Sequence, residues 1–153
     1  MNTFNNVIFG QKALIINDAG KILIIKRDKE LIYIEKWDVP GGKLDNDETL
    51  IEALTREIKE EVGLELHKII CTLTSSKFEG KLSGNLTIYR NIYLCRADGE
   101  IKLSSEHSEY KWVSPGDLTN FEFGEDDDLS YVLKSLPQIL STVDINISYS
   151  KLI

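Results

Sequence analysis

The chain has few cysteines, no long apolar run and no excess of basic charge. Only two of its 153 residues are cysteines, Cys71 and Cys95, and their separation matches no metal-binding or redox motif. We therefore expect unpaired thiols in a reducing compartment, and hence a cytoplasmic protein. No apolar segment is long enough to span a bilayer, and the N-terminus lacks the basic-then-apolar pattern of a secretion signal, so we expect no membrane association.

The balance of charge is acidic. The chain carries 25 acidic and 18 basic residues, a formal net charge of −7. An extended nucleic-acid surface needs a basic stripe, so this function is not expected. With 42% hydrophobic residues and neither repeats nor a low-complexity linker, residues 1–153 are expected to form one domain. Within it, residues 144–153 are a C-terminal extension whose structural role the sequence does not identify.

The most informative segment contains three glutamates. Read as a helix, Glu57, Glu60 and Glu61 stand at i, i+3 and i+4, so their carboxylates share one face. Like charges at this spacing repel and weaken a helix. A hard divalent cation with oxygen ligands would offset the repulsion, and Mg²⁺ held by carboxylates and substrate phosphates is a common arrangement. The segment is therefore a candidate catalytic site.

The flanking residues support a helix. Thr49 and Glu52 form a capping box at its start, and Gly63 is a natural stop. An apolar stripe runs between these ends at helical spacing, through Ile51, Leu54, Ile58 and Val62. Just upstream, Pro40-Gly41-Gly42 predicts a tight loop whose bare backbone can approach a ligand closely.

This pattern resembles a known motif. Gly42, Glu48, the run Arg56 to Glu61 and the pair Gly63-Leu64 match every fixed position of the Nudix box, over residues 42–64. The flanking strands and a later Glu-x-x-Trp-Val segment, residues 109–113, extend the likeness less specifically. The resemblance implies an α/β/α sandwich with a mixed central sheet and a divalent-metal-dependent hydrolase of phosphoanhydrides.

The resemblance also implies roles for individual residues. It places Mg²⁺, or Mn²⁺ as a substitute, on Glu57, Glu60 and Glu61, with the carbonyl of Gly41 as a further ligand. Residues with structural roles in the motif are Gly42, Glu48, Arg56 and Gly63, and Arg56 is expected to pair with a carboxylate such as Glu48.

The proton acceptor is less clearly marked. Glu57 is one candidate, and Glu60 belongs to the same catalytic set. The family often supplies a further glutamate from a later loop, here Glu106 or Glu109, with a slight preference for Glu109. His107 is an alternative base, although a lone loop histidine is more often a bystander.

The expected substrate is a nucleoside diphosphate linked to another group: a nucleoside triphosphate, a nucleotide sugar or a dinucleoside polyphosphate. Arg27 and Arg90 are weaker candidates for substrate contact. Arg90 could instead be a strand-end charge that reaches water. One alternative function is a nucleotide-sensing domain without hydrolysis, and another is a prenyl-diphosphate isomerase, which would need an active-site cysteine. The sequence leaves a homodimer open.

Strand patterns flank the predicted helix on both sides. Apolar and β-branched runs predict strands at residues 7–9, 13–17, 21–26, 37–39, 66–78, 86–96 and 109–113. Residues 79–85 read as a turn, 114–118 as a turn that opens a short helix, and 129–140 as a second amphipathic helix preceded by acids at 126–128. Residues 144–153 alternate like a strand.

Overall fold

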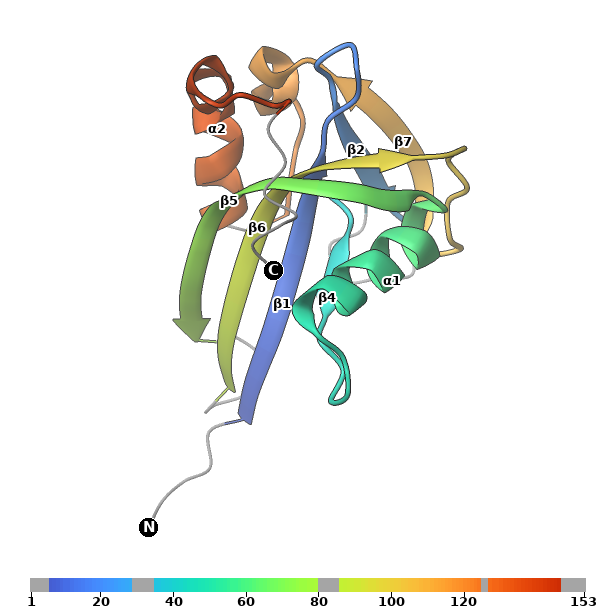
Figure 1. Ribbon diagram of the computed structural model, residues 1–153, viewed down its shortest axis with the longest axis vertical. Helices are drawn as coiled ribbons and strands as arrows, with labels where there is room; N and C mark the ends of the chain where they lie inside the picture. Colours follow the sequence, from blue (N-terminus) through green and yellow to red (C-terminus); the bar gives the residue numbers. More distant parts are fainter. Residues whose placement is uncertain (1–5, 29–34, 80–85, 125–126, 147–153) are drawn as a thin grey trace.

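The computed structural model describes residues 6–28, 35–79, 86–124 and 127–146. Figure 1 shows the arrangement of the elements. In chain order these elements are β1 (Asn6–Ile15), β2 (Ile22–Arg27), β3 (Trp37–Asp38), β4 (Gly41–Lys43), α1 (Leu50–Val62), β5 (Glu65–Glu79), β6 (Leu86–Asp98), β7 (His107–Val113), the 3-10 helix η1 (Pro115–Asn120) and α2 (Asp127–Thr142).

The strands form two sheets. One has the order β4-β1-β6-β5 and is mixed, because β1 runs parallel to β6 while β4 and β5 pair antiparallel to their neighbours. The other has the order β3-β2-β7 and is antiparallel. The expected α/β fold with a mixed sheet is confirmed.

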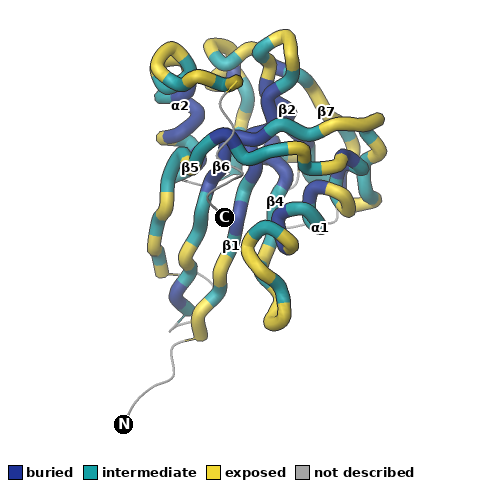
Figure 2. Tube along the Cα trace, viewed as in Figure 1, coloured by how far each residue is buried: buried dark blue, intermediate teal, exposed yellow. Residues whose placement is uncertain are grey.

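The two helices cover opposite faces of the strands. Side chains alternate along a strand, so neighbours such as Ala13 and Leu14 point to opposite faces. Ala13 belongs to a buried cluster with Leu54 and Ile58 of α1, whereas Leu14 belongs to one with Leu133 of α2. Figure 2 shows buried residues as dark blue stretches within the helices and along the middle of the strands. The described residues therefore form two cores, separated by the strands.

Helix α1 has the boundaries that the sequence predicts. The side chain of Thr49 accepts from the backbone N–H of Glu52, and the Glu52 carboxylate accepts from the backbone N–H of Thr49, which completes the capping box. Gly63 ends the helix in the left-handed region, at φ 75°, where glycine has no steric penalty. These two ends fix which residues of α1 face the sheet.

Two predictions of elements near the site were wrong in detail. Residues 6–15 form one strand, because the polar pair Gln11 and Lys12 continues the ladder with β6 without a break. Residues 41–43 form β4 and do not make a loop. A Cβ on Gly41 would clash with the carbonyl oxygen of Gln11, so glycine is what allows this strand to lie so close to β1.

Other predictions lie partly outside the described residues. Residues 80–85 of the predicted turn 79–85 lie outside the described residues, as do residues 147–153 of the predicted strand 144–153. In the described part of the second segment, Ile145 and Asn146 form a turn, so the strand prediction was wrong there. Among the described residues, no helix combines the length and the apolar character needed to cross a membrane.

Candidate active site

Helix α1 and strand β4 bring two of the three glutamates together with the two glycines. The Glu61 carboxylate accepts from the backbone N–H of Gly41 at 2.8 Å. The Glu57 carboxylate packs against Gly42 so closely that a Cβ at Gly42 would overlap it. The side chains of Glu57 and Glu61 are only 17% and 15% exposed, so both acids are held at the buried edge of α1.

Glu60 lies farther out, with 60% of its side chain exposed. Arg56 joins the acids: its Nη1 donates to Glu57 at 2.9 Å and to Glu60 at 3.4 Å. Its Nε and Nη2 donate to the two carboxylate oxygens of Glu48 at 2.5 and 2.9 Å, and Nη2 also reaches the carbonyl of Lys43. The predicted Arg56–Glu48 pair is therefore present, and it ties the loop before α1 to the helix.

Burial changes the acidity of the glutamates. Burial raises the pKa of Glu61 to about 8, and the nearby negative charges of Asp38 and Glu57 add to the effect, although the Gly41 hydrogen bond opposes it. Burial also raises the pKa of Glu57, against the opposing effect of Arg56. In contrast, hydrogen bonds from Arg56 lower the pKa of Glu48 to about 2.

The chemistry of these residues fits a divalent cation. Carboxylate and carbonyl oxygens are the ligands that Mg²⁺ prefers. A divalent ion near Glu57 and Glu61, which are largely buried beside two glycines, would stabilise their ionised form. Across the described part of the chain, however, no three His, Cys, Asp or Glu side chains converge on one point. Glu60, whose side chain is largely exposed, lies apart from the buried pair Glu57 and Glu61.

The loop before β7 closes one side of this edge. The backbone N–H of Ser104 donates to the carbonyl of Glu61 at 2.9 Å, and the Oγ of Ser104 lies 3.2 Å from His107 Nδ1. His107 is 7% exposed, and its Nε2 lies 4.0 Å from a Glu61 oxygen. Burial lowers the pKa of His107, and the positive charge of Arg27 lowers it further. Both effects favour the neutral imidazole beside Glu61, against the opposing negative charges of Asp38 and Glu106.

Glu106, in the loop before β7, and Glu109, on β7 itself, have different surroundings. Glu109 pairs with Lys111 at 3.2 Å and, more loosely, with Lys26 at 4.0 Å. Glu106 acts electrostatically on both Arg27 and His107. Glu106 is thus linked electrostatically to Arg27 and His107, whereas Glu109 is paired with lysines. The slight preference for Glu109 stays a prediction.

Arg27 lies in a group that the sequence did not single out. Its Nη2 and Nε donate to Asp38 Oδ2 at 2.8 and 3.3 Å, and Lys12 donates to Asp38 Oδ1. The signal was present in the sequence: Lys12 interrupts an apolar strand, and Asp38 stands between Trp37 and Val39. Charged residues inside strands are rarely buried without a partner.

Arg90 has a different environment from the one expected for a charge at a strand end. Its guanidinium donates to Asp128 at the start of α2, lies 5.0 Å from the ring centroid of Phe78, and is only 12% exposed. The interpretation as a charge that reaches water was therefore wrong. Arg90 lies on β6 on the α2 side of the sheet, where the neighbouring cluster residues Ile92 and Leu94 also point.

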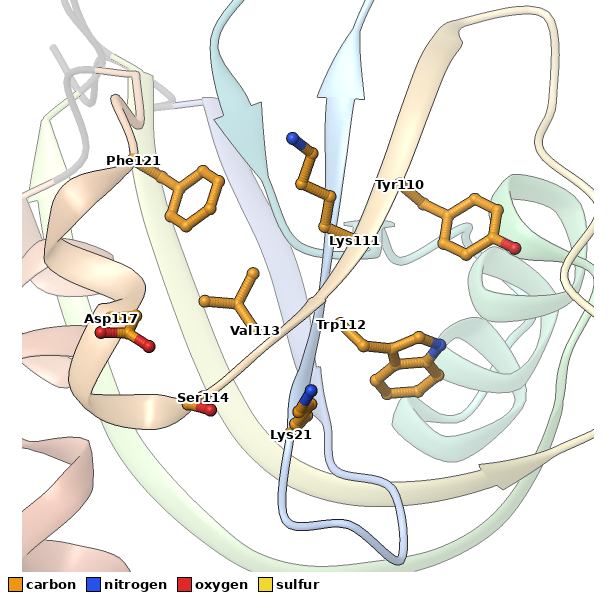
Figure 3. A pocket seen from close by; sticks show the side chains of 8 residues that line it. All are labelled: Lys21, Tyr110, Lys111, Trp112, Val113, Ser114, Asp117 and Phe121. Atoms are coloured by element: carbon orange, nitrogen blue, oxygen red, sulfur yellow. The ribbon is translucent and has the colours of Figure 1, made fainter.

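A shallow hollow of about 540 Å³ lies along β7 and η1, away from the glutamates. Figure 3 shows Tyr110 and Trp112 on one side of β7, Lys111 and Val113 on the other, and Lys21 below. None of the acids or arginines expected in the site lines this hollow. The residues of the candidate site on α1 and β4 therefore lie outside this hollow.

Comparisons with known proteins agree with the geometry. A family model described as the NUDIX domain matches residues 10–134. The chain is 29% identical to the nucleoside triphosphatase NudI of Escherichia coli strain E24377A, over 71% of this chain and 83% of that protein. NudI of Shigella flexneri matches equally well.

Solved structures give the same picture. The MutT protein of Methanosarcina mazei Go1 superposes with a TM-score of 0.71 at 26% identity, covering 91% of this chain and 99% of that one. The MutT NUDIX hydrolase of Burkholderia pseudomallei does so with a TM-score of 0.69 at 28% identity, covering 84% and 97%. Since the family model covers most of the chain and the box lies on α1 and β4, the chain belongs to the Nudix family of hydrolases.

Proposed function

We propose that this Nudix hydrolase cleaves a phosphoanhydride bond of a nucleoside triphosphate with the help of Mg²⁺, which Mn²⁺ can replace. The single observation that carries the proposal is the packing of Glu57 and Glu61 of α1 against Gly42 and Gly41 of β4. Among the substrate classes considered from sequence, the triphosphate is favoured by the resemblance to nucleoside triphosphatase NudI.

The proposed ligands of the ion are Glu57, Glu60 and Glu61, with the carbonyl of Gly41. A bound divalent ion would neutralise charge on the phosphates and make an attacking water more acidic. Other residues of the chain hold these acids in place. The N–H of Gly41 orients Glu61, and Glu48 holds Arg56 beside Glu57. Because Arg56 also reaches Glu57 and Glu60, it neutralises part of their charge before the ion binds.

For the proton acceptor we propose an acid close to Arg27 and His107, and Glu106 fits this better than Glu109. Glu57 remains the alternative on the helix itself. Arg27, 34% exposed at the end of β2, is the proposed contact for substrate phosphate. Arg90 would contact substrate only by exchanging its bond with Asp128.

The prenyl-diphosphate isomerase is disfavoured by the positions of the thiols. Cys95 is fully buried in the cluster with α1, and its burial raises the pKa of the thiol. Cys71 lies on β5, and burial raises its pKa as well. Both are free cysteines that pack as small apolar side chains. A thiol that takes part in proton transfer would need access to substrate.

The test is turnover of a panel of nucleoside triphosphates, nucleotide sugars and dinucleoside polyphosphates, with products separated by chromatography. We expect hydrolysis with Mg²⁺ or Mn²⁺ and none after chelation. Glu60→Gln should lower kcat by at least about a hundredfold, since one ligand of the ion is lost. Glu65→Gln, the same change at an exposed glutamate just beyond the helix, is the matched control.

Both variants should keep the melting temperature within a few degrees of the parent. Turnover that survives in Glu60→Gln, with the fold intact, would reject the metal assignment. Turnover that is insensitive to chelator would reject the divalent ion itself.

The remaining proposals concern the whole chain. We propose that residues 1–153 form one domain and that the protein acts in the cytoplasm. Two free thiols and a nucleotide substrate support the cytoplasmic assignment. The homodimer that the sequence leaves open is tested by light scattering, which distinguishes the mass of one chain from that of two.

A further inference from the structure

Asp38 is a buried acid placed between two cations. Its side chain is 12% exposed, and it accepts from Lys12 on one oxygen and from Arg27 on the other. The first oxygen also accepts from the backbone N–H of Val39 at 2.8 Å. Both carboxylate oxygens of Asp38 are thus engaged, and the residue links strands β1, β2 and β3.

The trio lies beside the acids of the candidate site. Lys12 is paired across the sheet with Gly41, whose N–H binds Glu61. Lys12 and Asp38 both act electrostatically on Glu61, and Glu61 in turn acts on Arg27. Lys12 and Arg27 together outweigh Asp38, so the trio carries a net positive charge at the edge where a polyphosphate would meet the ion.

The geometry fixes the cations in place. Arg27 uses both Nε and Nη2 on one carboxylate oxygen, which restrains a long side chain that would otherwise sample many rotamers. Lys12, only 12% exposed, is restrained by the same carboxylate. Positive groups that are already oriented lose less entropy when an anion binds.

We propose that Asp38 is a positioning residue that holds Arg27 and Lys12 as a paired cation site for the phosphate chain of the substrate. The inference rests on the proposed function and assigns Lys12 a role in binding. Asp38 acts through the two cations and does not itself contact the substrate. Loss of Asp38 should therefore weaken substrate binding and leave the chemical step nearly unchanged.

The test is a double-mutant cycle with steady-state kinetics on the best nucleoside triphosphate. Asp38→Asn and Arg27→Gln should each raise KM about tenfold, with kcat within about threefold. The double variant should raise KM further than Arg27→Gln alone, but by less than the product of the two single effects, because Asp38 acts partly through Arg27 and partly through Lys12. Additive effects, or a fall in kcat at unchanged KM, would overturn the inference. Asp18→Asn, which removes the partner of Arg96 at 2.6 Å, is the control and should leave both constants unchanged.

A second readout does not depend on turnover. Calorimetry with inorganic tripolyphosphate in EDTA measures anion binding by the protein alone. The parent should bind, and Arg27→Gln or Lys12→Met should weaken binding at least about fivefold. No binding by the parent would overturn the inference. If Asp38→Asn fails to fold, Asp38→Glu should restore folding and a KM close to that of the parent. Tripolyphosphate binding by Arg27→Gln and Lys12→Met still tests the inference in that case.

The two proposals fail separately. An enzyme that binds tripolyphosphate through Arg27 and Lys12 but hydrolyses no nucleoside triphosphate would reject the proposed function and keep the paired cation site. Triphosphate turnover whose KM is unchanged in the Asp38, Arg27 and Lys12 variants would keep the proposed function and reject the paired cation site.

Discussion

At the scale of single residues, the close packing of Gly41 and Gly42 against neighbouring atoms shapes the candidate site. Gly42 has no Cβ, and the Glu57 carboxylate occupies the space that a Cβ would need. The same is true of Gly41 and the carbonyl of Gln11. These contacts place both glycines tightly against their neighbours around the candidate site, although neither has a side chain.

Gly42→Ala tests this proximity. The added methyl should displace Glu57, lower turnover by at least about tenfold and destabilise the fold by about 1–3 kcal/mol, as overpacking does. Gly116→Ala is the matched control, because a Cβ there meets no atom within 4 Å. Turnover and urea unfolding of both variants provide the measurement, and equal behaviour of the two would contradict the account.

Asp38 makes the stability of the fold depend on pH. Burial alone would raise its pKa, but the charges of Lys12 and Arg27 and their hydrogen bonds lower it from 3.8 to about 2. A carboxyl group whose pKa is lower in the folded than in the unfolded protein stabilises the fold at any pH above its unfolded pKa. This stabilisation is lost as pH falls from about 4 to about 2.

Urea unfolding of the parent and of Asp38→Asn at several pH values checks the sign. We expect the parent to be more stable by on the order of 2 kcal/mol at neutral pH, and the gap to narrow as pH falls below about 4. A gap that stays constant down to about pH 2 would show that the ionised carboxylate contributes nothing.

At the scale of elements, helix α1 depends on its ends. Thr49 and Glu52 cap it reciprocally, whereas Ser114, at the start of η1, makes no side-chain cap bond. The difference provides a comparison between two N-caps in one chain.

Thr49→Ala should therefore cost about 1 kcal/mol of stability, and Ser114→Ala should cost much less. Chemical denaturation of the two variants measures this directly. Because α1 carries Glu57, Glu60 and Glu61, fraying of its first turn should also reduce turnover in Thr49→Ala. Equal stabilities of the two variants would show that the capping box is not needed.

The ends of α1 could be predicted from the sequence, because capping chemistry and helical periodicity are both local. The pairing of residues 41–43 as β4 could not, since it depends on how close β1 lies. Nor could the trio of Lys12, Arg27 and Asp38, which comes from three strands. The different partners of Glu106 and Glu109 could not be predicted either, because they come from residues distant in sequence.

At the scale of the whole molecule, the strands separate two cores. The candidate site lies where α1 meets β4, the edge strand of the mixed sheet. Helix α1 packs on one face and α2 on the other, so the central strands are apolar on both faces near their middle. The site therefore rests on elements that are anchored from both sides. Of the three glutamates on α1, Glu60 has the most exposed side chain.

The central claim is that the acids of α1 hold a divalent ion. Its most direct test is a titration with Mn²⁺ followed by electron paramagnetic resonance, on the parent and on the double variant Glu57→Gln/Glu61→Gln. We predict that the double variant binds Mn²⁺ at least about tenfold more weakly, while Glu65→Gln/Glu100→Gln, with the same loss of charge at exposed positions, binds as the parent does. Equal affinity in all three proteins would contradict the account.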